Sequence, residues 1–94
     1  MMENNVKILK LITGEELITR ILEGDKELLT MQRPMIIKII TPAGGGPIGV
    51  QIYDWSEVGE IDKITLETKH ILAIIDPKPT AEKQYLSVIT GLTL

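Results

Sequence analysis

The chain has 94 residues, a formal net charge of −3, one histidine and no cysteine. These values exclude disulfides, thiolate or multi-histidine metal sites and a cysteine nucleophile, and they show no overall basic character of the kind that indicates nucleic-acid binding. No apolar run reaches the roughly 20 residues of a membrane span, and the opening residues lack the pattern of a secretory signal. We expect a single cytoplasmic domain over residues 1–94.

The first elements depend on how one segment is interpreted. Residues 6–13 are dense in β-favouring side chains and predict a strand with both faces covered. Residues 13–24 allow two structures. Thr13 and Glu16 fit the capping box of a helix, and the apolar residues after them have helical spacing. The alternative is the second strand of a hairpin that turns at Gly14.

The middle of the chain alternates strand and loop signals. Residues 25–40 run from a turn into an apolar strand, in which Pro34 predicts a bulge, a bend or an edge because proline has no N–H to donate. The segment TPAGGGP (41–47) is the strongest loop signal in the sequence. Residues 48–55 alternate apolar and polar side chains as a strand does, and the polar segment 56–62 predicts a loop.

The last third predicts two strands and a helix. Residues 63–77 indicate two strands joined by a tight turn near Glu67 to Lys69, and the second, HILAII, is so apolar that we expect it to be central. Thr80 is the expected N-cap of a helix over about 80–90. The apolar face of this helix comprises Ala81, Tyr85, Val88 and Ile89. Short antiparallel strands connected in sequence then close into a small, strongly bent barrel.

This order of elements resembles the Sm/LSm-like fold, and specifically the small Sm-like proteins of cyanophage and marine metagenomic origin. The likeness rests on VKILKLITGEELITRILEGD (6–25), QRPMII (32–37), DW (54–55) and KHILAIIDP (69–77) followed by a helix with Tyr85. A Thr-Gly-Glu-Glu-Leu turn in that family joins two strands, so the resemblance implies a hairpin at Gly14. The implied fold is mainly β: a five-stranded antiparallel Sm-like barrel, here with a C-terminal helix where the family norm is N-terminal.

The resemblance also implies self-assembly. The expected partner is the chain itself, in a cyclic homo-oligomer of five to seven subunits with the pentamer favoured, located in the host cytoplasm if the protein is phage-encoded. The alternative is a monomer whose sheet edges are covered by the C-terminal helix.

The loops that bind RNA in this family are altered here. Typical RNA-binding members carry an Asp-x-x-Met-Asn loop before the third strand, whereas Asp25 is followed by KELLTM in this chain. They also carry Arg-Gly before the fifth strand, where Glu67 and Thr68 stand in this sequence. The resemblance therefore implies the fold and the ring but not the uridine pocket.

Contacts with single-stranded RNA or DNA would have to come from basic residues. The candidates are Lys69, His70, Lys26, Arg33 and Lys78. His70 beside Lys69 suits a phosphate or base contact; the alternative is a partly buried histidine at the start of a strand. A cyclic assembly would repeat each basic residue around its axis and build a positive rim, whereas in the alternative these residues only keep the domain soluble.

Nothing in the sequence predicts an enzyme. The acidic residues lie in polar turns without an apolar pocket to raise a carboxyl pKa, and AGGGP lacks the Gly-Lys-Ser/Thr of a P-loop. We expect no catalytic residue, metal or cofactor. The leading hypothesis is a ring that binds nucleic acid in phage-type RNA or DNA processing; the alternative is a structural or protein-interaction adaptor that retains the ring without nucleic-acid binding.

Overall fold

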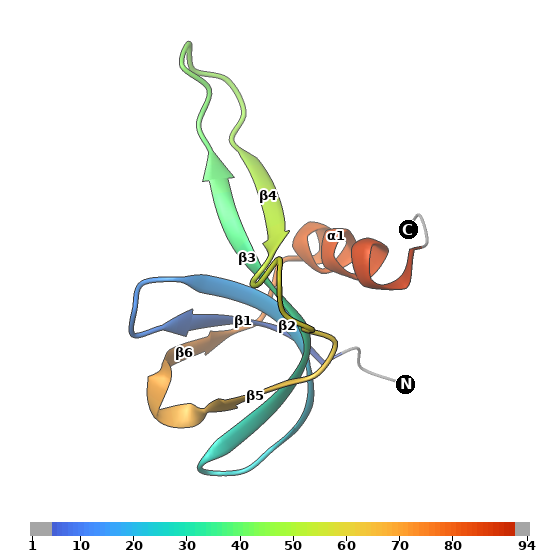
Figure 1. The fold of residues 1–94 in the computed structure, drawn as a ribbon. Coiled ribbons are helices and arrows are strands. Elements are labelled where there is room, and N and C mark those ends of the chain that lie inside the picture. Colours follow the sequence, from blue (N-terminus) through green and yellow to red (C-terminus); the bar gives the residue numbers. More distant parts are fainter. Residues whose placement is uncertain (1–4, 92–94) are drawn as a thin grey trace.

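The structure, a computed structural model that describes residues 5–91, is a strongly bent antiparallel sheet with one helix (Figure 1). The elements are β1 (Val6–Leu11), β2 (Glu16–Gly24), β3 (Leu28–Ile40), β4 (Gly49–Asp54), β5 (Ile64–Glu67), β6 (Ile71–Ile75) and α1 (Pro79–Thr90), with a single 3-10 turn (Thr68–His70) between β5 and β6. The strand order is β4-β3-β2-β1-β6, and β5 also pairs with β3.

The sheet has six strands where the sequence predicts five, and the long strand β3 explains the difference. β5 pairs with its first residues, Leu28 to Met31, and β4 pairs with its last, Met35 to Ile40. β4 and β5 are therefore two parts of one interrupted strand, separated by the predicted polar loop. The bent antiparallel barrel with a C-terminal helix is confirmed.

Residues 13–24 form a hairpin with β1 and not a helix. Gly14 has a φ of +95°, a conformation that glycine adopts without the steric cost of a side chain, and its N–H donates to Leu11 O at 2.9 Å. Leu17 and Ile18 are both buried, although they lie on opposite faces of β2. The apolar residues have helical spacing because both faces of this strand are covered.

Two apolar clusters lie on the two faces of the bent sheet. The cluster inside the barrel contains Leu9, Leu11, Leu17, Leu29 and Met31. The cluster between the sheet and α1 contains Val6, Ile18, Met35, Tyr85 and Leu86. Because alternate residues of β1 and β2 point to opposite faces, the same two strands supply both clusters.

A bulge in β3 holds the helix in place. Pro34 is buried beside Arg33, whose φ is +40°, and the pairing of β2 with β3 shifts register between Ile18 and Arg20. The predicted irregularity at Pro34 is thus confirmed. The hydroxyl of Tyr85 accepts a hydrogen bond from the Arg20 N–H at 3.1 Å and donates to the carbonyl oxygen of Gln32.

The start of α1 differs from the expectation. Lys78 occupies the N-cap position without a side-chain hydrogen bond, and Pro79 occupies the first turn. Thr80 is therefore inside the helix and does not cap it, because Pro79, with its fixed φ and missing N–H, suits the first helical position. The buried face includes Leu86, which the prediction left out, whereas Val88 is 38% exposed. Gly91 ends the helix in the left-handed conformation.

The prediction that the second apolar strand is central was wrong. This strand, β6, lies at the end of the sheet order and pairs only with β1 among residues 5–91. Leu72 is 67% exposed, and Ile74 and Ile75 are also exposed. α1 packs on a face of the sheet and leaves this edge open, so helix cover does not explain why the strand is apolar.

Candidate nucleic-acid interface

Two turns distant in sequence meet at the end of the barrel opposite the β3–β4 hairpin (Figure 1). The β2–β3 turn contains Asp25, Lys26 and Glu27, and the β5–β6 turn is the 3-10 turn that begins at Thr68. The Thr68 N–H donates to Glu27 O at 2.9 Å, and the Thr68 hydroxyl donates to Lys26 O. These hydrogen bonds fix the two turns as one unit, which we call the rim.

Asp25 shapes the first of these turns. Its Oδ1 accepts hydrogen bonds from the backbone N–H groups of Leu28 at 2.9 Å and Glu27 at 2.8 Å, and its own N–H donates to Leu28 O. Both backbone donors favour the charged carboxylate and lower the pKa of Asp25 below its usual value. Asp25 thus holds the β2–β3 turn of the rim in its conformation.

Replacing Asp25 with alanine is expected to destabilise the protein at pH 7 and to have less effect in acid. A carboxylate with a lowered folded-state pKa stabilises the fold above the unfolded-state pKa of about 4, and this contribution is lost as the pH falls through the folded-state value. Urea midpoints of wild type and Asp25→Ala should differ at pH 7 and converge toward pH 2. Glu57→Ala, in an exposed loop, is the control. Equal midpoints at pH 7 would contradict this role.

Charges of both signs gather on the rim. A hollow of about 250 Å³ there is lined by Lys26, Glu27, Glu67, Thr68 and Lys69. Glu67 Oε2 lies 3.4 Å from Lys69 Nζ, and Glu67 Oε1 lies 3.7 Å from His70 Nε2. All three side chains are substantially exposed, so water screens these contacts and leaves Lys69 and His70 accessible to a ligand.

Three of the five candidate residues come together, and two do not. Lys26, Lys69 and His70 lie on the rim. Arg33 is in β3, where its Nε and Nη2 donate to the Asp54 carboxylate at 3.0 and 3.4 Å. The Asp54 carboxylate, which accepts these hydrogen bonds, raises the pKa of Arg33. Lys78 lies at the start of α1 and lines a separate hollow.

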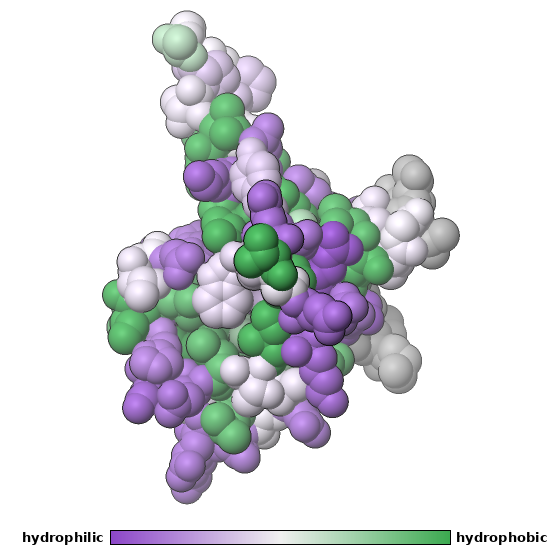
Figure 2. All heavy atoms as spheres, in the orientation of Figure 1, coloured by the Kyte–Doolittle hydropathy of each residue, from purple (hydrophilic) through white to green (hydrophobic). Residues whose placement is uncertain are grey.

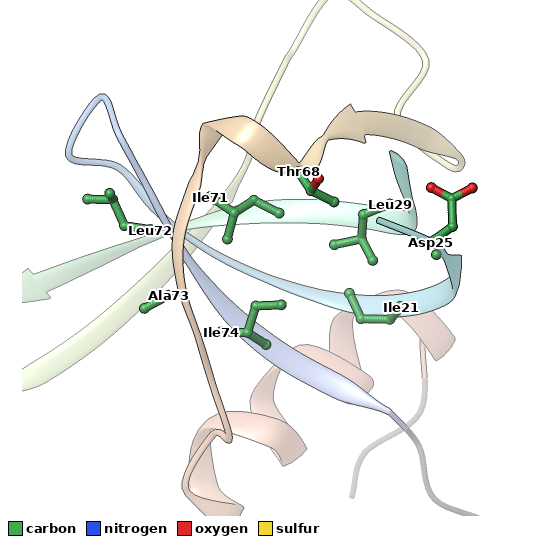
Figure 3. Close-up of a pocket in the computed structure, with 9 residues that line it drawn as sticks. Ile21, Asp25, Leu29, Thr68, Ile71, Leu72, Ala73 and Ile74 are labelled. Carbon is green, nitrogen blue, oxygen red and sulfur yellow. The ribbon is translucent and has the colours of Figure 1, made fainter. Parts of the chain in front are cut away.

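An apolar hollow of about 640 Å³ opens beside the rim (Figure 3). Side chains from three strands point into it: Ile21, Leu29, Ile71 and Ile74. Thr68 and Asp25 lie at its border, so the hollow joins the rim to the exposed edge at β6. The rim therefore offers cations and hydrogen-bonding groups beside an apolar surface.

Sequence reasoning missed the residues that join the turns. Thr68 was noted only as a departure from a family motif, and its bonds to residues 26 and 27 span more than 40 positions. A signal did exist for Asp25, because aspartate directly after Gly24 is typical of a turn in which the side chain accepts backbone hydrogen bonds.

The described residues contain no group of three or more His, Cys, Asp or Glu side chains that could hold a metal ion. No helix among residues 5–91 is long and apolar enough to cross a membrane.

The fold and the rim define a class: a small, bent antiparallel β-barrel that presents two joined turns at one end. The family model for the Sm-like domain matches residues 8–86. The chain belongs to the Sm-like family. Proteins of this family typically form oligomeric rings and bind RNA. A search of curated proteins found no match.

Proposed function

We propose that the protein is a non-enzymatic Sm-like ring that binds single-stranded nucleic acid at its rim. The observation that carries the assembly is the apolar edge strand β6, with Leu72 and Ile74 exposed in a single copy. Pairing of β6 with the outer edge of β4 in the next copy would satisfy backbone groups and cover these side chains. The same head-to-tail contact repeated around an axis closes a ring.

Ring closure would multiply the charges of the rim. Each subunit contributes Lys26, Lys69 and His70 from turns that are hydrogen-bonded to each other. Repeated around the axis, the two lysines form a circle of positive charge that can follow a phosphate backbone, and the imidazole of His70 adds a ring on which a base can stack. The resemblance to Sm-like proteins of cyanophage origin favours five subunits and a role in RNA or DNA processing in the host cytoplasm.

A second candidate, a protein-interaction adaptor, is favoured by the carboxylates of the same rim. Glu27 and Glu67 share the small hollow with the two lysines, and Glu67 stands within 3.4 Å of Lys69. Carboxylates repel phosphate and attract cationic side chains. An adaptor would keep the ring and use this mixed surface for a protein partner.

Fluorescence anisotropy with labelled single-stranded RNA and DNA at 50 and 200 mM salt tests the two candidates. The double variant Lys26→Glu, Lys69→Glu is expected to weaken binding more than about 10-fold, because each reversal replaces an attraction with a repulsion. Wild-type affinity should also fall steeply with salt. The control Lys38→Glu, Lys83→Glu changes net charge equally at exposed positions outside the rim, and it should change affinity less than about threefold. Absence of wild-type binding at 50 mM salt would exclude nucleic-acid binding and leave the adaptor.

A further inference from the structure

The β3–β4 hairpin extends beyond the barrel as a two-stranded arm, residues 39–50 (Figure 1). Its strands pair Ile39 with Val50 and Ile40 with Gly49, and its loop contains a turn closed by a hydrogen bond from Gly45 N–H to Pro42 O at 3.2 Å. A two-stranded ribbon is at best marginally stable in water when nothing covers it. The arm therefore gains most from contact with another surface.

One face of the arm is an apolar ladder. Directly paired residues share a face of the sheet, so Ile37 with Ile52 and Ile39 with Val50 form two successive apolar rungs. The inner rung packs against the cluster under α1, whereas Ile39 at the outer rung is 62% exposed. Ile48, which follows the tip, is 65% exposed. The helix thus covers only the base of this face.

The same face borders a groove of about 320 Å³, which we call the arm groove. Most of its lining is apolar and comes from the arm and the barrel, including Ile8, Ile37, Ile39, Val50, Ile52 and Ile75. Glu16, Asp76 and Lys78 also line it. Gln84 of α1, which also lines the groove, donates to Val50 O at 3.3 Å and fixes the arm against the helix. Figure 2 shows apolar surface continuing from the barrel onto the arm.

The charge pattern favours a second copy of this chain as the occupant of this groove. Residues 39–53 form the longest stretch of the sequence without Asp, Glu, Lys, Arg or His, in a chain whose net charge is −3. Two copies of this chain carry the same net negative charge, and a two-fold contact places each charged region close to a copy of itself. An uncharged apolar arm is the part of the molecule that tolerates its own copy best.

We infer that two copies associate through their arms, each laying its Ile39–Val50 rung into the arm groove of the other. Such a contact is self-complementary, because the arm and the groove belong to the same subunit and exchange roles under a two-fold axis. It uses a face of β4, whereas the proposed ring uses the hydrogen-bonding edge of that strand. The two contacts are therefore compatible, and arm pairing would join two rings face to face.

Solution mass measured by light scattering tests this pairing. The variant Ile39→Thr, Val50→Thr keeps β-branched residues in the strands but places hydroxyl groups on the apolar rung. Its mass should be half that of wild type. The control Ile12→Thr, Val58→Thr changes two exposed aliphatic residues outside the arm and should keep the wild-type mass. Ile48→Lys, which adds a charge outside the strands, should also halve the mass and serves if the first variant does not fold.

The test depends on whether the mass of wild type is twice that of the arm variants. This ratio is expected whether or not the subunits also form rings. A wild-type dimer that becomes a monomer would support arm pairing and contradict the ring. An unchanged mass in both arm variants would overturn the inference and show that a different partner covers this face. A fall to less than half would also overturn it, because the arm would then belong to the side-by-side contact.

Discussion

Replacing Tyr85 with alanine is expected to lower the free energy of unfolding by about 3–5 kcal/mol, the range for removing a buried aromatic side chain. Tyr85 is fully buried and connects α1 to the bulge in β3. Tyr85→Phe should lower the free energy of unfolding by about 1–3 kcal/mol. It leaves the Arg20 N–H without its acceptor and removes the hydrogen bond that the hydroxyl donates to Gln32 O. Urea unfolding followed by circular dichroism measures both losses. A loss below about 0.5 kcal/mol for both variants would contradict this role.

Alkaline pH offers an independent check on the same hydroxyl. Burial raises the pKa of Tyr85 above its usual value, which means that the folded state holds this proton more tightly than the unfolded chain does. The protonated Tyr85 hydroxyl therefore contributes to the free energy of unfolding below about pH 10. This contribution is lost as the pH rises from the unfolded-state pKa through the folded-state pKa. Tyr85→Phe should therefore lose less stability than wild type between pH 9 and pH 11.

Leu72→Glu is expected to weaken assembly by at least about 100-fold and to give monomers at micromolar concentration. A carboxylate buried at every subunit contact without a partner costs several kcal/mol, and each 1.4 kcal/mol changes the affinity about 10-fold. The substitution should leave the fold intact because Leu72 is exposed in the single subunit. Sedimentation velocity measures the assembly, and Val58→Glu, at a fully exposed loop residue, is the control. An unchanged sedimentation coefficient for Leu72→Glu would show that β6 is not an interface.

Most strand positions were predictable because they depend on local patterns. Pro34 indicated the bulge, the glycine-rich segment indicated the loop of the arm, and the tight turn before β6 lies where the sequence placed it. Residues 13–24 were ambiguous because a strand covered on both faces has no polar alternation. Only the resemblance to a family decided between helix and hairpin there.

The misplaced strand β6 shows a physical limit of sequence reasoning. An apolar segment indicates that something covers its side chains, but it does not tell whether the cover comes from the same chain or from another. Among residues 5–91, β6 pairs with β1 along one edge and with no strand along the other. The candidate site had a similar limit, since the hydrogen bonds of Thr68 to the β2–β3 turn depend on tertiary structure.

The most direct test of this account is native mass spectrometry of the wild-type protein, because the binding surface depends on ring closure. We expect a closed assembly with a fixed number of 10.5 kDa subunits, five to seven in each ring, or twice that number when arms join two rings. The same number should hold across a wide range of concentrations, because a closed ring leaves no free edge for growth. A monomer at 10.5 kDa under the same conditions would contradict the central claim.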